Sequence, residues 1–124
     1  MADSSGSAIP RGPLGVVRAM RWSLMGLRAA WRVESSFRLE VYLATLMVPA
    51  ALWLGSDALE RVLMVGSVLL VLAGELLNSA LEAAVDRFGP ERHELIGRAK
   101  DMGSAAVFVL MVNGVFCWSL LLLN

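Results

Sequence analysis

The sequence predicts an all-α membrane protein, and three observations support that fold class. Hydrophobic residues make up 57% of the 124 residues, and the mean hydropathy is +0.65, above the apolar share of an average soluble domain. Three apolar stretches approach the roughly 20 residues that a helix needs to cross a bilayer. Because the length suits one domain, we expect three transmembrane helices in a single bundle, at about residues 37–54, 62–86 and 102–123.

The chain before the first span predicts two different kinds of structure. Residues 1–13 are rich in Ser, Gly and Pro, which predicts a disordered N-terminus without the features of a signal peptide. The membrane domain then covers residues 14–124. Within it, residues 14–34 repeat apolar side chains at helical spacing and carry four arginines, which are Arg18, Arg21, Arg28 and Arg32. This pattern favours an amphipathic helix in the membrane interface over an ordinary packing helix.

The ends of the three predicted spans are not equally well marked in the sequence. The first reaches full length only if Arg38 and Glu40 lie at the interface, where long side chains extend toward water. Pro49 should kink that helix or free a carbonyl. The second span should end at Gly89-Pro90. The third is the most apolar, with Asn113 as its strongly polar residue.

The distribution of basic residues predicts the orientation in the membrane. Six arginines precede the first span, whereas the loop between the first two spans holds only Arg61. The loop after the second span holds four basic residues, and the tail after the third holds none. We therefore expect the N-terminus to be cytoplasmic and the C-terminus external. The formal net charge of zero gives no indication of nucleic-acid binding, and the single Cys117 indicates neither a disulfide framework nor a metal cluster.

Acidic residues inside the second span indicate a functional site, because a carboxylate at membrane depth is costly. On a helix, Glu75, Ser79, Glu82 and Asp86 fall on one face, about 16 Å long, and Asn78 borders it. The alternative is a purely structural role in interhelical hydrogen bonding. Two glutamates and an aspartate on one face would repel one another in that role, so the functional reading is favoured.

The loop before the third span adds residues suited to a bound polyphosphate. It contains Glu91, His93, Lys100 and Asp101. His93 alone favours a solvated residue over a metal ligand, because no second His or Cys accompanies it. Carboxylates without such ligands favour Mg²⁺, which takes one or two carboxylates together with substrate phosphates. The glycine-rich motifs of P-loop and dinucleotide-binding proteins and the protein-kinase motifs are absent from the sequence.

Several segments together resemble one family, the bacterial integral-membrane diacylglycerol kinases. The resemblance covers Arg18 to the C-terminus. It is carried by Glu75-Leu-Leu-Asn-Ser-Ala-Leu-Glu-Ala-Ala-Val-Asp86, His93-Glu-Leu, Arg98-Ala-Lys-Asp-Met-Gly-Ser-Ala-Ala106, Gly26-Leu-Arg-Ala-Ala-Trp31, and Glu34 with Phe37-Arg38 and Glu40. It implies a homotrimer with one interfacial and three transmembrane helices per subunit in the bacterial inner membrane. The implied reaction transfers the γ-phosphate of MgATP to diacylglycerol and gives phosphatidic acid.

The resemblance also implies roles for individual residues. Glu75 would be the general base, and Glu34 and Glu82 would hold Mg²⁺. The implied nucleotide contacts are Trp22, Glu34, Glu82, Glu91, His93, Lys100 and Asp101. The implied lipid-substrate contacts are Arg28, Trp31, Arg61, Glu75 and Ser104, while Asn78 and Asp86 would line the site. Gly15 stands where relatives have an arginine that contacts ATP, so Arg11 or Arg18 would have to replace that contact.

Two alternatives remain open from the sequence. Relatives in Gram-positive bacteria phosphorylate undecaprenol, so the acceptor lipid is undecided between that alcohol and diacylglycerol. A non-enzymatic conduit for protons or cations would also use intramembrane carboxylates, although it would not need the polar loop from Glu91 to Asp101. For the trimer, we expect sites between subunits, with Glu34 of one chain completing the site of its neighbour.

Overall fold

Four helices account for nearly all of the structure, a computed structural model that describes residues 12–89 and 93–124. They are α1 (Pro13–Val33), α2 (Ser35–Leu54), α3 (Ala58–Asp86) and α4 (Glu94–Leu123). The helices α2, α3 and α4 are each long and apolar enough to cross a membrane. The prediction of an all-helical chain is therefore confirmed for the described residues, with three helices able to span a membrane. Of the predicted disordered segment 1–13, residues 1–11 lie outside the described residues, as does the site residue Glu91, whereas Pro13 already begins α1.

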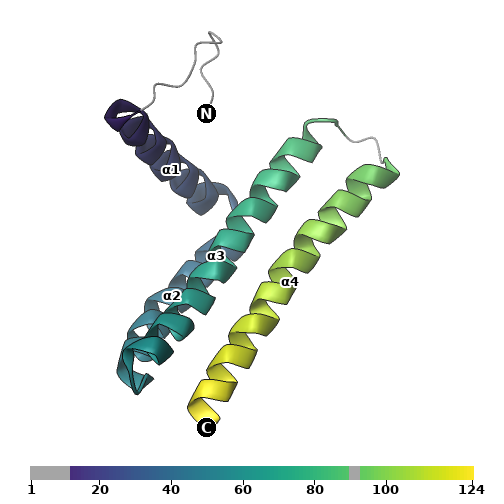
Figure 1. Ribbon diagram of the computed structural model, residues 1–124. Helices are drawn as coiled ribbons and strands as arrows, with labels where there is room; N and C mark the ends of the chain where they lie inside the picture. The colour runs from purple at the N-terminus through teal and green to yellow at the C-terminus, as the bar shows by residue number, and fades with distance from the viewer. Residues whose placement is uncertain (1–11, 90–92) are drawn as a thin grey trace.

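The helix α1 projects away from the three long helices and meets them only near its C-terminal end (Figure 1). It begins at Pro13, a residue favoured in the first helical turn because it lacks an N–H to satisfy. Most of its side chains are exposed, and Ala30 near its end is the buried residue. The arrangement leaves the arginine-bearing surface of α1 free of the rest of the chain.

Helices α2 and α4 both pack against α3. Helix α4 runs alongside α3 over most of its length, and α2 packs against α3 as well (Figure 1). Their cores are small: Met64 and Ala51 are fully buried, and Phe37 is nearly so. Most large apolar side chains of these helices remain exposed, as expected where lipid or further copies of the chain cover them.

Polar contacts fasten α4 to the first half of α3. The indole Nε1 of Trp118 donates to the Met64 carbonyl and to the Ser67 hydroxyl, at 3.1 Å each. The Ser67 hydroxyl in turn donates to the Met64 carbonyl at 2.8 Å, and the Cys117 thiol approaches the Leu63 carbonyl at 3.6 Å. Such interhelical bonds fix the register of two helices where apolar contacts alone would let them slide.

Local capping explains why the helices begin earlier than the predicted spans. Asp57 accepts the Glu60 N–H at 2.8 Å, and Glu60 accepts the Ser56 N–H at 3.0 Å, so α3 starts at Ala58 rather than near residue 62. His93 performs the same role for α4, which starts at Glu94 rather than near residue 102. Helix α2 passes through Pro49 without interruption. Helix α3 ends at Asp86, just before Gly89 with its positive φ of 85°, as predicted.

Candidate active site

Among the residues that the structure describes, Glu75 is the buried carboxylate. Its side chain lies on α3, and the residue is 8% exposed. Glu40 of α2 shares a side-chain hydrogen bond with it, and Glu34 and Glu82 both lie within electrostatic reach. Four carboxyl groups from three different parts of the chain are thus gathered around one buried position.

Glu34 is placed by the sharp change of direction between α1 and α2. It is the single non-helical residue between them, with φ −103° and ψ 107°. The Arg38 guanidinium donates to the carbonyls of Trp31 and Arg32 at 2.7 and 3.2 Å, which satisfies acceptors that the end of α1 leaves free. The rings of Trp31 and Tyr42 also meet edge-to-face at 5.5 Å. These contacts hold the turn that carries Glu34.

Asn78 links the site to the interface between α3 and α4. Its Nδ2 donates to Glu82 Oε1 at 3.3 Å. Its Oδ1 is buried and has no hydrogen-bond partner within residues 12–89 and 93–124. Gly103 of α4 lies directly opposite, and a Cβ at that position would collide with Asn78 Oδ1 and Leu81. The close approach of the two helices therefore depends on glycine at residue 103.

Asp86 and Lys100 form an ion pair between the C-terminal end of α3 and the N-terminal part of α4. Asp86 at the end of α3 accepts from Lys100 Nζ at 2.6 Å, and both side chains remain partly exposed. Lys100 thus lies in the second turn of α4, directed toward α3. The ion pair places one cationic group on the same side of the molecule as Glu82, where a polyphosphate would require it.

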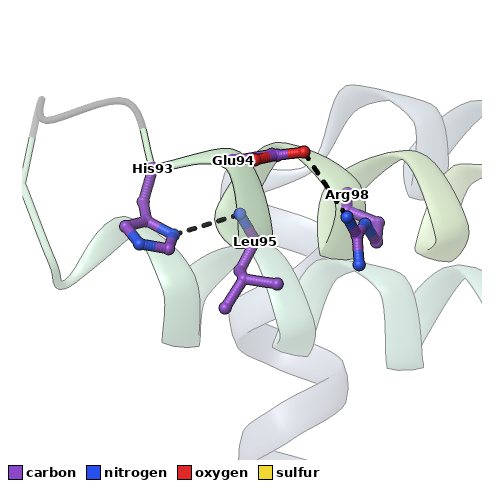
Figure 2. A network of polar contacts seen from close by, with 4 residues as sticks. All are labelled: His93, Glu94, Leu95 and Arg98. Atoms are coloured by element: carbon purple, nitrogen blue, oxygen red, sulfur yellow. Dashed lines mark hydrogen bonds and ion pairs between the residues drawn. The ribbon is translucent and has the colours of Figure 1, made fainter.

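His93 stands at the start of α4 and has a structural contact. Figure 2 shows its ring turned back toward the first turn of the helix, where Nδ1 accepts the Leu95 N–H at 3.1 Å. Glu94 and Arg98 form an exposed ion pair at 3.5 Å one turn further on. Nδ1 of His93 is occupied by this cap, which leaves Nε2 available to a ligand.

The remaining predicted residues are placed at varying distances from this cluster. On α1, Trp22 is half-buried, whereas Arg28 and Trp31 are exposed. On α4, Asp101 and Ser104 are exposed next to Lys100. Arg61 does not join them, because it lies 14 residues before Glu75 on the same helix, about 21 Å away at 1.5 Å per residue. Its Nε donates to the Leu52 carbonyl at 3.0 Å and caps the end of α2.

The carboxylates suit a hard cation that completes its coordination with other ligands. Within the described residues no group of three or more His, Cys, Asp or Glu side chains is arranged to hold a metal ion. Glu34 and Glu82, which both lie within electrostatic reach of Glu75, are the carboxylates that would hold Mg²⁺ if phosphates provided further ligands. This arrangement fits a metal bound together with a nucleotide better than a closed structural metal site.

Sequence reasoning missed the contributions of Arg38 and Glu40 to the site. Both were assigned to the membrane interface because they stand near the start of the first span. The signal that could have identified Glu40 was present: it is a third intramembrane glutamate, and such residues usually face the interior of a bundle. Its partner could not be identified, since the contact depends on how α2 packs against α3.

These features define a helical protein with three helices long and apolar enough to cross a membrane and a buried carboxylate on one of them. The sequence profile described as Prokaryotic diacylglycerol kinase matches residues 21–122. The chain is 52% identical to the diacylglycerol kinase of Escherichia coli K12 over 107 residues, which cover 86% of this chain and 88% of that protein. It is 48% identical to the diacylglycerol kinase of Haemophilus influenzae Rd (83% and 87% covered) and 46% identical to that of Pseudomonas aeruginosa PAO1 (88% and 89% covered). The chain belongs to the prokaryotic diacylglycerol kinase family.

Proposed function

We propose that this protein is an ATP-dependent lipid kinase that phosphorylates diacylglycerol to phosphatidic acid, in the recycling of phospholipids. The observation that carries the proposal is the buried Glu75 with Glu34 and Glu82 within electrostatic reach, in a chain of this family. Phosphoryl transfer depends mainly on positioning and charge stabilisation. A base within the apolar layer would position the lipid alcohol for attack. Carboxylates that can hold a metal ion would allow the charge on the nucleotide phosphates to be stabilised.

Each cluster residue has a role in this proposal. Glu75 accepts the proton of the lipid hydroxyl as that oxygen attacks the γ-phosphorus and ADP leaves. Glu34 and Glu82 hold Mg²⁺, which when bound neutralises charge on the phosphates. Lys100, Asp101, His93 and Trp22 contact the nucleotide, together with Glu91. Asn78 holds Glu82 in place through its amide, while Asp86 orients Lys100 through their ion pair.

The acceptor is the first question for experiment. Purified protein in detergent micelles would be incubated with Mg²⁺ and γ-labelled ATP, and with either diacylglycerol or undecaprenol. The relatives described above are named diacylglycerol kinases, so we expect labelled phosphatidic acid and little labelled undecaprenyl phosphate. Labelling of neither lipid would refute the kinase proposal and leave the conduit alternative. The Glu75→Gln variant serves as the matched control for background phosphorylation.

The assembly and membrane placement belong to the same proposal. We propose a homotrimer with α1 in the cytoplasmic membrane interface, the N-terminus cytoplasmic and the C-terminus external in the bacterial inner membrane. The exposed arginines of α1 and the exposed apolar faces of α2–α4 support this arrangement. Chemical cross-linking in micelles tests it, and a ladder that stops at three subunits is the expected result.

Mixing two inactive variants shows whether a site is completed within one chain. If Glu34 of one chain completes the site of its neighbour, mixed trimers of inactive Glu34→Gln and Glu75→Gln chains should recover part of the activity. Complete absence of recovery after proven subunit exchange would refute shared sites, because every chain then carries one inactivating substitution in its own site.

A further inference from the structure

Glu40 has no assigned task in the proposed reaction, yet it is the carboxyl group that contacts Glu75. It projects from α2 toward α3, where the two side chains share a hydrogen bond. Its Oε2 is buried without any hydrogen-bond partner among the described residues. A buried polar oxygen without a partner is costly and calls for a reason.

The other surroundings of Glu40 offer it no polar partner. It lines a cavity of about 320 Å³ between α2, α3 and α4 whose remaining walls are apolar apart from Ser67. The Ser67 hydroxyl already donates to the Met64 carbonyl and accepts from Trp118. In the described part of the chain, neither Glu40 nor Glu75 forms an ion pair, since the two ion pairs there join Arg98 to Glu94 and Lys100 to Asp86. Glu75 is therefore the polar partner of Glu40 among the described residues.

The chemistry of this contact requires a proton. Ionised carboxylates only accept hydrogen bonds, so two carboxyl groups that share one must hold a proton between them. The charged groups around the pair reinforce this requirement: Glu34 from the α1–α2 turn and Glu82 from α3 are both acidic. On α4, Lys100 is engaged with Asp86, which lies about 16 Å along α3 from Glu75. Because Glu75 must be ionised to accept a proton from the lipid, the shared proton resides on Glu40.

We propose that Glu40 is a positioning residue for the general base. In its neutral acid form it donates a hydrogen bond to one oxygen of the Glu75 carboxylate, which fixes the rotamer of that side chain and leaves the other oxygen for the hydroxyl of the acceptor. Glu40 itself touches neither nucleotide nor lipid. This inference rests on the proposed function, because it assigns a task only if Glu75 acts as the base.

Two substitutions of similar size separate positioning from a structural role. Glu40→Gln keeps a donor to Glu75, so kcat with diacylglycerol and MgATP should stay within about threefold of wild type. Glu40→Met fills the same space without a donor, so kcat should fall about 10- to 100-fold, the range of one hydrogen bond to a charged group. The KM for MgATP should be unchanged in both. Leu43→Met, which alters the same cavity wall away from Glu75, is the matched control and should retain wild-type kcat.

The pH profile of kcat provides a readout that a merely structural residue would not move. At high pH the wild-type protein should lose activity as Glu40 ionises and stops donating, and Glu40→Gln should lack this alkaline limb. In a Glu75→Gln background, Glu40→Met should cause no further loss, because the positioned group is already absent. If Glu40→Met proves unfolded by circular dichroism, the alkaline limb of Glu40→Gln decides the question alone.

The outcomes distinguish this inference from the proposed function. Wild-type kcat in folded Glu40→Met, or an alkaline limb unchanged in Glu40→Gln, would overturn the positioning role while leaving the kinase intact. An equal loss in both variants with a raised KM would assign Glu40 to substrate binding and overturn the inference as well. Absence of phosphatidic acid with the wild-type protein would instead overturn the proposed function on which the inference depends.

Discussion

Replacing Gly103 by alanine should disturb the active site from the opposite helix. The added Cβ would meet Asn78 Oδ1 and lie 2.9 Å from Leu81 Cδ2, so α3 and α4 would have to separate or Asn78 would have to move. Forcing a methyl group into a packed interface costs about 1–3 kcal/mol. Alanine regains at most about 1 kcal/mol over glycine in a helix interior. The net loss of stability is thus expected to lie between about 0 and 3 kcal/mol.

The same helix supplies two matched controls for this substitution. A Cβ at Gly97 or Gly114 would meet nothing within 4 Å, so Gly97→Ala and Gly114→Ala should be neutral or stabilising by up to about 1 kcal/mol. Unfolding of the three variants in micelles would be followed by circular dichroism, with kinase activity measured in parallel. Gly103→Ala should also lower activity, because Asn78 holds Glu82 through its amide at 3.3 Å. If Gly103→Ala matched the controls in both stability and activity, the close contact between residues 78 and 103 would not exist in the protein.

The remaining predictions concern the carboxylates and the helix contact at the other end of the bundle. Glu75→Gln should reduce kcat about 10²- to 10⁴-fold, the range of a general base, with MgATP binding retained in a nucleotide-binding assay; near-normal turnover would contradict its role. Glu34→Gln and Glu82→Gln should instead raise the Mg²⁺ concentration needed for half-maximal activity, and an unchanged Mg²⁺ titration would exclude them as ligands. Trp118→Phe removes the indole donor to the Met64 carbonyl and Ser67, so thermal unfolding should show a loss of about 0.5–1.5 kcal/mol with kcat unaffected. A drop in kcat would show that this contact also shapes the site.

The parts of the fold that were predictable are those that a local pattern determines. Hydropathy and length suffice to predict three spans, because an uninterrupted apolar helix is the stable form of such a segment in a bilayer. Helical periodicity likewise predicts that Glu75 and Glu82 share a face. It does not predict that Glu75 is buried while Asp86 is exposed, since burial depends on which helix covers each position. The contact between Glu40 and Glu75, and the fit of Gly103 against Asn78, follow from helix packing and have no local signal.

The capping of α4 shows a different limit of sequence reasoning. The sequence favoured His93 as a solvated residue over a metal ligand, since no second His or Cys accompanies it. A helix cap was not considered, and Ser, Thr, Asp and Asn are the usual capping residues. The structure uses its Nδ1 for that purpose and extends the helix back to Glu94. This extension brings Lys100 into a regular helical turn opposite Asp86. A cap that the sequence did not predict thus determines where the candidate nucleotide cation stands.

The order of polar residues along α3 and α4 agrees with the order of the reacting groups across a membrane surface. Helix α4 has 30 residues, about 45 Å at 1.5 Å per residue, whereas the hydrocarbon layer is about 30 Å thick. Its charged residues all precede Met102, so we expect the excess length, and with it the Lys100–Asp86 pair, to lie at the polar side. Glu82 and Glu75 then follow about 6 and 16 Å further along α3 from Asp86. With the roles proposed above, the nucleotide cation Lys100, the metal carboxylate Glu82 and the base Glu75 would follow one another from water toward the lipid. That is the order in which a phosphoryl group must pass from ATP to a membrane acceptor.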